Sequence, residues 1–353
     1  MERLYDKLKA YSESDFYAFH MPGHKRNKAL LGIELPYDLD ITEIDGFDDL
    51  HHADGILKEE QERAARVFGA EESHFLVNGS TAGILSAVMG CTHRGDKILV
   101  ARHCHKSIYH AIYMNGLVPR YVYPEFDISM HMNGEISKED VAKALAAEPD
   151  IKAVVIVSPN YDGVVSDVKG IAEVAHSYRI PLIVDEAHGP HFGFHPAFPG
   201  RANDLGADVV INSLHKTLPS LTQTAILHIN GKIVNRRRIK KYLDMLQSSS
   251  PSYIFMASLD ACVDFVDGKC ENAFELYVER LQKFREELKP LQHLQILRTE
   301  HYDISKVVIS TANANITSPE LAERLRKEYH LEMEMTGGTY VLAMTTVADT
   351  QEG

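Results

Sequence analysis

The stretch ADVVINSLHKTLPSLTQTA, residues 207 to 225, joins a short apolar run to a lysine. Residues 207 to 213 are rich in β-branched side chains, which is typical of a strand buried on both faces. Ser213, His215 and Lys216 follow at once. Polar side chains at the carboxyl end of such a strand lie where ligands collect in parallel sheets. The stretch therefore predicts a functional lysine, although most lysines in proteins are solvated.

Three other apolar runs have the same character, and they cover residues 96–102, 151–159 and 180–188. Segments with helical periodicity separate the runs, for example residues 137–148. Strands that alternate with helices predict a parallel sheet covered on both faces. The fold class that we expect is therefore α/β.

The pattern of apolar and charged residues changes beyond residue 250. A charged helical stretch covers about residues 271–290, and the short runs QILRT, KVVIST and GTYVLAMTT follow it. We expect an N-terminal segment near the active site (1–50), a large domain (51–250) and a small α+β domain (251–353). The last residues, TTVADTQEG, resemble the start of a helix, so we expect the small domain to be truncated.

Composition excludes several classes of protein. The net charge of −13 opposes binding to nucleic acid or to anionic lipid. No apolar run approaches the roughly 18 residues of a membrane span, and MERLYDKLKA lacks the apolar core of a signal peptide. The four cysteines form no C-x-x-C pair. We expect a cytoplasmic protein with no membrane partner and free thiols.

A phosphate site is predicted between residues 74 and 90, HFLVNGSTAGILSAVMG. An apolar strand, a small-residue turn and a helix follow one another, and the helix N-terminus with the hydroxyls of Ser80 and Thr81 suits a phosphate. An ordinary helix cap explains the same residues. The chain has no G-x-x-x-x-G-K-[ST] motif, so VDEAH at residues 184–188 is not the acidic box of a helicase.

The loop DEAHGPHFGFH, residues 185–195, raises the possibility of a metal site. Asp185, His188, His191 and His195 are candidate ligands. The loop contains glycine and proline and therefore lacks the helical spacing of H-E-x-x-H. We expect no metal, because hydrogen bonding and packing also produce loops rich in histidine.

A lysine, an acid and a phosphate site together suit pyridoxal phosphate. Lys216 would form the imine, Asp185 would keep the pyridine nitrogen protonated, and the phosphate would lie at Ser80 and Thr81. The separation of 31 positions from Asp185 to Lys216 leaves room for one crossover and one strand, so the two groups can lie on neighbouring strands.

Five motifs resemble the major domain of the Orn/Lys/Arg decarboxylases: FHMPGHKRN, NGSTAGI, RHCHKSIYHA, VDEAH and SLHKTLPSLTQTA. The resemblance covers residues 19 to about 260 and implies a fold-type-I pyridoxal-phosphate enzyme with a central, mostly parallel sheet. It implies that Lys216 is the Schiff-base lysine, that Asp185 is the pyridine partner and that His105 stacks on the ring. The residues implied around the phosphate are Ser80, Thr81, Ser213 and His215.

The chain also differs from the family pattern in some respects, and the resemblance implies further roles for its residues. We expect no N-terminal wing like that of the long members, because the chain is similar to the short, arginine-decarboxylase-like ones. His188 is expected to contact the cofactor at a position where some long members have tryptophan. The family forms homodimers with shared sites, and Ser249 in QSSSPSY is implied to reach the phosphate of the neighbouring chain.

Three hypotheses about function remain. The first is decarboxylation of a basic amino acid, arginine before lysine or ornithine. The second is another reaction on the same cofactor, such as transamination or aldol cleavage. The third is a homologue with impaired catalysis. Lys216, His215 and Lys106 are the candidate proton donors, and Glu13, Asp15, Asp45, Asp48 and Asp49 are candidate acids for the substrate side chain.

Overall fold

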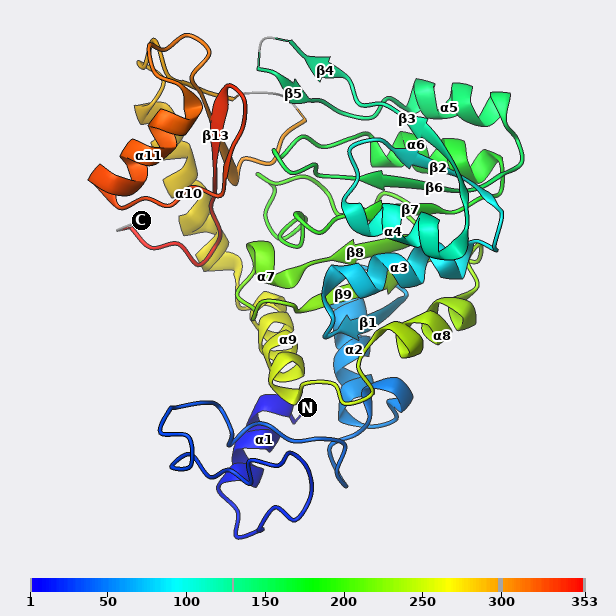
Figure 1. Cartoon of the computed structure of the whole chain (residues 1–353), viewed down its shortest axis with the longest axis vertical. Coiled ribbons are helices and arrows are strands. Elements are labelled where there is room, and N and C mark those ends of the chain that lie inside the picture. Colours follow the sequence, from blue (N-terminus) through cyan, green and yellow to red (C-terminus); the bar gives the residue numbers. More distant parts are fainter. Residues whose placement is uncertain (1, 129, 298–300, 352–353) are drawn as a thin grey trace.

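The computed structural model describes residues 2–128, 130–297 and 301–351, and a seven-stranded sheet forms its centre (Figure 1). The strands lie in the order β1 (Glu72–Leu76), β9 (Ala225–Ile229), β8 (Val209–Asn212), β7 (Leu182–Asp185), β6 (Ile151–Val157), β2 (Lys97–Ala101) and β3 (Val118–Val122). β9 runs antiparallel to both of its neighbours, and the other neighbouring pairs are parallel. The predicted α/β class with a mostly parallel sheet is confirmed.

The strands form where apolar, β-branched residues are continuous. Every residue of β7, β8 and β9 is buried, as expected for strands that are covered on both faces. The covering helices are α2 (Ile56–Val67), α3 (Gly79–Cys91), α4 (Lys106–Asn115), α5 (Lys138–Ala147), α6 (Val168–Ser177) and α8 (Arg236–Leu246). Their side chains join the strands in two large apolar clusters. None of the helices in the described part of the chain is long and apolar enough to cross a membrane.

A second sheet follows in the C-terminal part of the chain. The helices α9 (Tyr253–Val266) and α10 (Glu271–Glu287) lead to four antiparallel strands with α11 (Ser318–Tyr329) beside them (Figure 1). The strand order is β10 (Gln295–Ile296), β11 (Lys306–Ser310), β13 (Tyr340–Met344) and β12 (Met335–Thr336). The predicted run QILRT is a strand at Gln295–Ile296, while its residues 298 and 299 lie outside the described residues. A bridge between Val164 and Tyr302 joins this part to the loop after β6.

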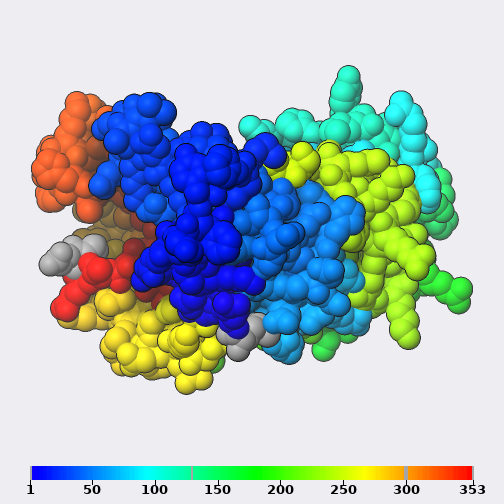
Figure 2. Space-filling model, turned by 90° about the horizontal axis from the view of Figure 1, so that it is seen from below, coloured from blue at the N-terminus to red at the C-terminus, as the bar shows by residue number. Residues whose placement is uncertain are grey.

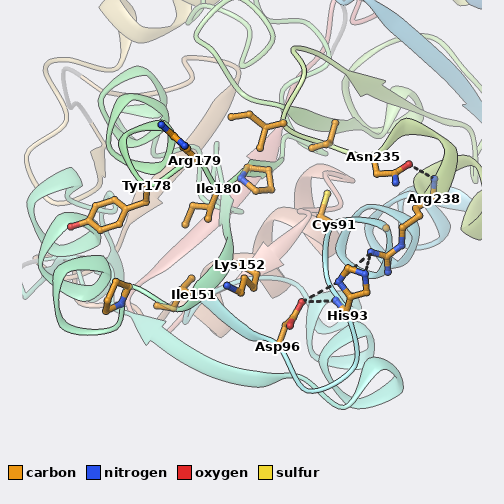
Figure 3. A pocket seen from close by; sticks show the side chains of 15 residues that line it. Cys91, His93, Asp96, Ile151, Lys152, Tyr178, Arg179, Ile180, Asn235 and Arg238 are labelled. Carbon is orange, nitrogen blue, oxygen red and sulfur yellow. Dashed lines mark hydrogen bonds and ion pairs between the residues drawn. The ribbon is translucent and has the colours of Figure 1, made fainter.

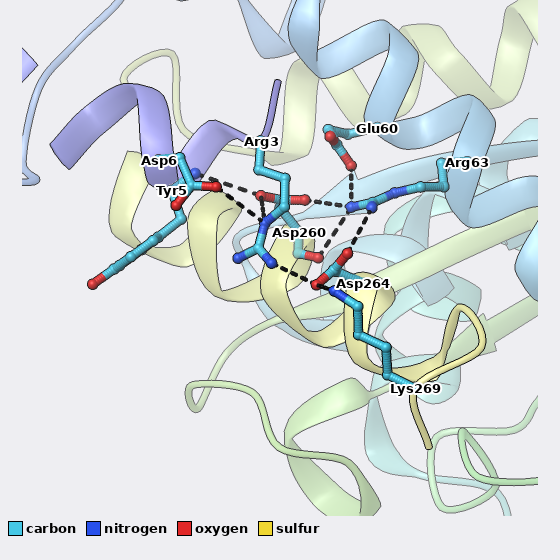
Figure 4. A network of polar contacts seen from close by, with 8 residues as sticks. All are labelled: Arg3, Tyr5, Asp6, Glu60, Arg63, Asp260, Asp264 and Lys269. Carbon is cyan, nitrogen blue, oxygen red and sulfur yellow. Dashed lines mark hydrogen bonds and ion pairs between the residues drawn. The ribbon is translucent and has the colours of Figure 1, made fainter. Parts of the chain in front are cut away.

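The N-terminal helix α1 (Leu4–Ser12) packs against α9 through a buried charge network (Figure 4). Arg63 on α2 donates hydrogen bonds to Glu60 and to Asp260, and both carboxylates are fully buried. Arg3 lies 2.5 Å from Asp264 on the same face of α9. Burial and the negative charge of Asp260 raise the pKa of Glu60 to about 8.

Replacing Arg63 with leucine should lower the free energy of unfolding by about 3 to 5 kcal/mol, because two carboxylates stay buried without their cation. The deficit should be smaller at about pH 6 than at about pH 9, since protonation of Glu60 below its raised pKa removes one of the unpaired charges. Urea unfolding at both pH values measures this. Arg66→Leu, at an exposed position of the same helix, is the control. Equal losses in the two variants would contradict a role for the network.

Candidate active site

The candidate site lies at the carboxyl edge of the large sheet. β7 ends at Asp185, and β8 ends at Asn212, which leads into the short helix α7 (Leu214–Thr217) that carries Lys216. β7 and β8 are parallel neighbours, with Asp185 opposite Ile211. The parallel register therefore brings the strand-end acid and the strand-end lysine to the same edge of the sheet.

Asp185 is a buried carboxylate whose charged form a cationic partner would stabilise. Its side chain is only 3% exposed, and Oδ1 accepts a hydrogen bond from the backbone N–H of Ala187. Burial raises the pKa of Asp185 above its usual range, and the positive charge of Lys216 opposes that shift. A buried acid of this kind binds a positively charged group well, because both charges then gain a partner in a medium of low dielectric constant.

Lys216 is half-buried, and its amine is in contact with a histidine. Nζ of Lys216 lies 3.0 Å from Nε2 of His188, which is 6% exposed. Burial lowers the pKa of Lys216, while the charges of Asp185 and Glu334 raise it in part. A lysine with a lowered pKa is the form suited to attack a carbonyl group.

Ser80 and Thr81 lie at the beginning of α3, which starts at Gly79. Gly79 has a φ of +72°, and its N–H donates to the carbonyl of Gln223. The turn therefore requires glycine and aims the start of a 13-residue helix at the sheet edge. The first N–H groups of such a helix and two adjacent hydroxyls are suited to an anion.

His105 is the N-cap of α4, because its Nδ1 accepts the backbone N–H of Ser107. Partial burial and the positive charge of Lys216 lower the pKa of His105. The ring therefore lies within electrostatic reach of the lysine. Ser213 is fully buried, with Oγ 3.4 Å from Nδ1 of His215, and the same Nδ1 lies 3.0 Å from the carbonyl of Thr224.

Ser249 is exposed, and within the described chain no hydrogen bond joins it to the residues around Lys216. The backbone N–H of Ser248 donates to Oδ1 of Asn78, so the segment QSSSPSY adjoins the turn that precedes α3 in its own chain. The structure thus groups Asp185, His188, His105 and Lys216 by direct or electrostatic contact. It positions Ser80, Thr81 and Ser213 at ends of neighbouring elements.

Sequence reasoning missed two polar residues of the C-terminal part. Lys306 on β11 is fully buried, and its Nζ lies 3.1 Å from Nδ1 of His188. Glu334 accepts a hydrogen bond from the hydroxyl of Tyr161, and its charge acts on Lys216 and on Lys306. The local sequence around them has no motif, so neither could be found without the fold.

Two of the candidate acids of the N-terminal segment, Asp48 and Asp49, accept hydrogen bonds from backbone N–H groups close to them in sequence. The carboxylate of Asp48 accepts backbone N–H groups of Asp54, Gly55 and Leu57 at the start of α2. Asp49 accepts the N–H of His51. Both acids therefore cap their own loops.

The three histidines of the 185–195 loop contact different partners. His191 lies 3.1 Å from Asp303, and His195 lies 3.1 Å from Glu275, while His188 contacts the two lysines. Within residues 2–128, 130–297 and 301–351, no three His, Cys, Asp or Glu side chains converge as metal ligands do.

A pocket of about 560 Å³ lies at the opposite edge of the sheet, near the amino ends of β2, β6 and β7 (Figure 3). Its polar groups bond to one another: Arg238 donates to His93 and to the carbonyl of Thr92, and His93 lies 3.6 Å from Asp96. Strand-end chemistry in parallel sheets occurs at the other edge. We therefore assign the candidate site to the edge with Lys216.

The donor set fits pyridoxal phosphate. A buried acid, a lysine of lowered pKa and a helix N-terminus with two hydroxyls match the three polar parts of that cofactor, its ring nitrogen, carbonyl and phosphate. The sheet order and this donor set are the arrangement expected of the fold-type-I class of pyridoxal-phosphate proteins.

Comparison with known proteins identifies the family. The model of the Orn/Lys/Arg decarboxylase major domain matches residues 3–316. The arginine decarboxylase of Bacillus subtilis is 34% identical over 99% of this chain and 74% of its own length. The uncharacterized protein YaaO of the same organism is 42% identical over 74% of this chain and 56% of its own length. The chain belongs to the Orn/Lys/Arg decarboxylase family, whose cofactor is pyridoxal phosphate.

A solved structure supports the fold. The lysine decarboxylase LdcF of Francisella novicida superposes with a TM-score of 0.85 at 20% identity, over 99% of this chain and 58% of that one. The chain therefore spans little more than half of the solved protein. At this identity the likeness concerns the fold, and the predicted fold-type-I architecture is confirmed.

Proposed function

We propose that this chain uses pyridoxal phosphate to remove CO₂ from a basic amino acid, with arginine as the first substrate and lysine or ornithine after it. The observation that carries the proposal is the Lys216 amine, of lowered pKa, within the field of the buried Asp185 at the sheet edge. Arginine comes first because the similarity to an arginine decarboxylase extends over nearly the whole chain.

Each residue of the site would contact a different part of the cofactor. Lys216 would bond to the cofactor carbonyl, and Asp185 would hold the protonated ring nitrogen. The cofactor, when bound, supplies a conjugated ring that accepts the electron pair left by CO₂. The residues proposed to hold the ring face and the phosphate are His105, His188, Ser80, Thr81, Ser213 and His215.

A cationic substrate suits the charges around the site. Glu334 lies close enough to Lys216 for its negative charge to raise the pKa of that amine. When Lys216 is bonded to the cofactor, Glu334 is free to attract the positive side chain of an incoming amino acid. The net charge of −13 gives the same preference at long range.

The test is direct. Purified protein loaded with pyridoxal phosphate is incubated with arginine, lysine and ornithine in turn, and the products are identified by mass. We expect the corresponding amine and CO₂, fastest with arginine. A keto acid in place of the amine would favour an aminotransferase, and no product with any of the three would favour an impaired homologue.

We also propose that the working unit is a homodimer with shared sites, as the family resemblance implies. Many large apolar side chains between residues 16 and 35 are exposed, which is unusual for a surface that stays in water. They are Phe16, Tyr17, Phe19, Met21, Leu30, Leu31, Ile33 and Leu35. Figure 2 shows the N-terminal segment (dark blue) on the outside of the molecule, available to a second copy.

Complementation should restore activity if the hydroxyls of Ser249 and Ser250 serve the neighbouring chain. Loss of a hydroxyl that bonds to a phosphate should weaken cofactor binding about tenfold or more. Lys216→Ala chains mixed with Ser249→Ala/Ser250→Ala chains should form hybrids with one intact site. Hybrids that form, as native mass spectrometry can show, and yet stay inactive would mean that each chain holds a self-contained site.

A further inference from the structure

His188 bridges two lysines, one on helix α7 and one on strand β11 of the second sheet. Its Nε2 lies 3.0 Å from Nζ of Lys216 on α7, and its Nδ1 lies 3.1 Å from Nζ of Lys306 on β11. The ring thus lies between the two amines, and the three side chains form a hydrogen-bonded line from α7 to β11. Among the residues that the structure describes, His188 is the one hydrogen-bond partner seen for the Lys306 amine.

Lys306 is held at the end of this line by its surroundings. Its side chain is 0% exposed. A Cβ at residue 163 would lie 2.7 Å from Cγ of Lys306, so Gly163, with a φ of +104°, leaves room for the stem. Buried lysines are rare unless they are paired or used.

Hydrogen bonding to the imidazole of His188 allows only one of the two lysines to carry a charge. Burial first, and then the charges of Lys306 and Lys216, hold the pKa of His188 well below its usual value, so the ring is neutral. A neutral imidazole donates at one nitrogen and accepts at the other, while an ammonium group can only donate. The lysine that accepts the ring N–H must therefore be an uncharged amine.

We propose that Lys306 and Lys216 share one proton through His188, so that Lys306 is the group that takes up the proton of the Lys216 amine and returns it. The inference rests on the proposed function, because Lys216 must lose a proton before it bonds to the cofactor carbonyl. It regains one when the substrate displaces it. Lys306 is thus a positioning residue that acts through His188.

The transfer is balanced in atoms and charge. An N–H bond of the Lys216 ammonium breaks and an Nε2–H bond of His188 forms, while the Nδ1–H bond breaks and an N–H bond forms on Lys306. The ring stays neutral and exchanges one tautomer for the other. The return runs through the same bonds in reverse, and it recharges Lys216 for proton donation to the substrate carbon.

The groups around the line suit this exchange. Burial, together with the charge of Lys216, lowers the pKa of Lys306 to about 8 against the opposing charges of Asp303, Glu334 and Asp162. Asp303 stays ionised, since its carboxylate accepts hydrogen bonds from Ser305 and pairs with His191. Asp162 accepts the hydroxyl proton of Tyr340. The other titratable side chains beside His188 are His105, His191 and Tyr161, whose ring lies 4.8 Å from the imidazole.

The test measures how fast the full chain, stripped of cofactor, takes up pyridoxal phosphate as the pH is raised. Uptake is followed by absorbance and by peptide mapping after borohydride reduction. Lys306→Met removes the second charge, so Lys216 should keep its proton to a higher pH. The midpoint should rise by about one unit, which is about tenfold slower uptake below it. Lys283→Met removes the same charge from an exposed position on α10 and should cause no shift.

Two further variants test the direction of the pH shift and whether the proton passes through His188. Lys306→Arg keeps a charge that does not titrate, so its midpoint should move to lower pH, opposite to Lys306→Met. His188→Phe keeps a ring against Tyr161 but has no nitrogen, so the buried Lys306 amine loses the hydrogen-bond partner that lets it carry the proton. Lys306 should then stay uncharged, and the midpoint should rise as in Lys306→Met. The double variant Lys306→Met/His188→Phe should show no additional shift.

The outcomes separate this inference from the proposed function. An unchanged midpoint in folded Lys306→Met, or fully additive shifts in the double variant, overturns proton sharing even if the wild type makes amine. If Lys306→Arg does not fold, the comparison of Lys306→Met with His188→Phe decides alone. Shifted midpoints in a chain that makes no amine support proton sharing and reject decarboxylation.

Discussion

Lys216→Ala should abolish covalent attachment of pyridoxal phosphate and lower turnover by about a thousandfold or more. Alanine offers no amine for the cofactor carbonyl and no proton for the substrate carbon. After borohydride reduction, peptide mapping of the wild-type chain should find the label on Lys216 alone. The variant should hold cofactor only reversibly, because the phosphate and ring contacts remain.

The control is Lys232→Ala, which removes a lysine from an exposed loop and should keep both label and turnover. Label on a different lysine in the wild type would contradict the assignment of Lys216. A Lys216→Ala chain that still turns over at the wild-type rate would do the same. The variant should stay folded, since the hydrogen bond known for the Lys216 amine is to His188 alone within the described chain.

The sequence was sufficient for the elements that carry local patterns. The runs predicted as strands at 151–159 and 207–213 contain β6 (Ile151–Val157) and β8 (Val209–Asn212). Continuous β-branched side chains identify such strands because both faces are buried. Asp185 and Lys216 could be assigned to one sheet edge for the same reason, since parallel neighbours end together. The domain boundaries and the individual roles of the site residues stay predictions.

Other features depend on contacts between distant parts of the chain. His188 and Lys306 are separated by 118 positions; His188 lies in the turn after β7, and Lys306 lies on β11 of the second sheet. A lysine in a strand of mostly apolar residues gives no sign that it is buried, because most lysines are exposed. The antiparallel direction of β9 was likewise not foreseen, since strand direction follows from the connections between elements and not from their composition.

Asp185→Asn should lower turnover by about a hundredfold or more and weaken cofactor retention far less. The amide is close in shape to the carboxylate, but it has no charge with which to keep the ring nitrogen protonated. Turnover of the amine product and the cofactor dissociation constant are measured on the same preparations. A variant with unchanged turnover removes Asp185 from the site.

Turnover and the stability of the cofactor-free chain together distinguish this role from that of a structural cap. Burial raises the pKa of Asp185, so its contribution to stability is present at low pH and declines as the pH rises through its raised value. At neutral pH, the amide that replaces this carboxylate carries no buried charge. The cofactor-free Asp185→Asn chain should therefore unfold at the same urea concentration as the wild type or at a higher one. The side-chain oxygen of the amide can still accept the N–H of Ala187, so a role as a structural cap alone predicts that the variant keeps its turnover as well as its stability. Loss of turnover with unimpaired stability would leave the charge of Asp185 as the cause.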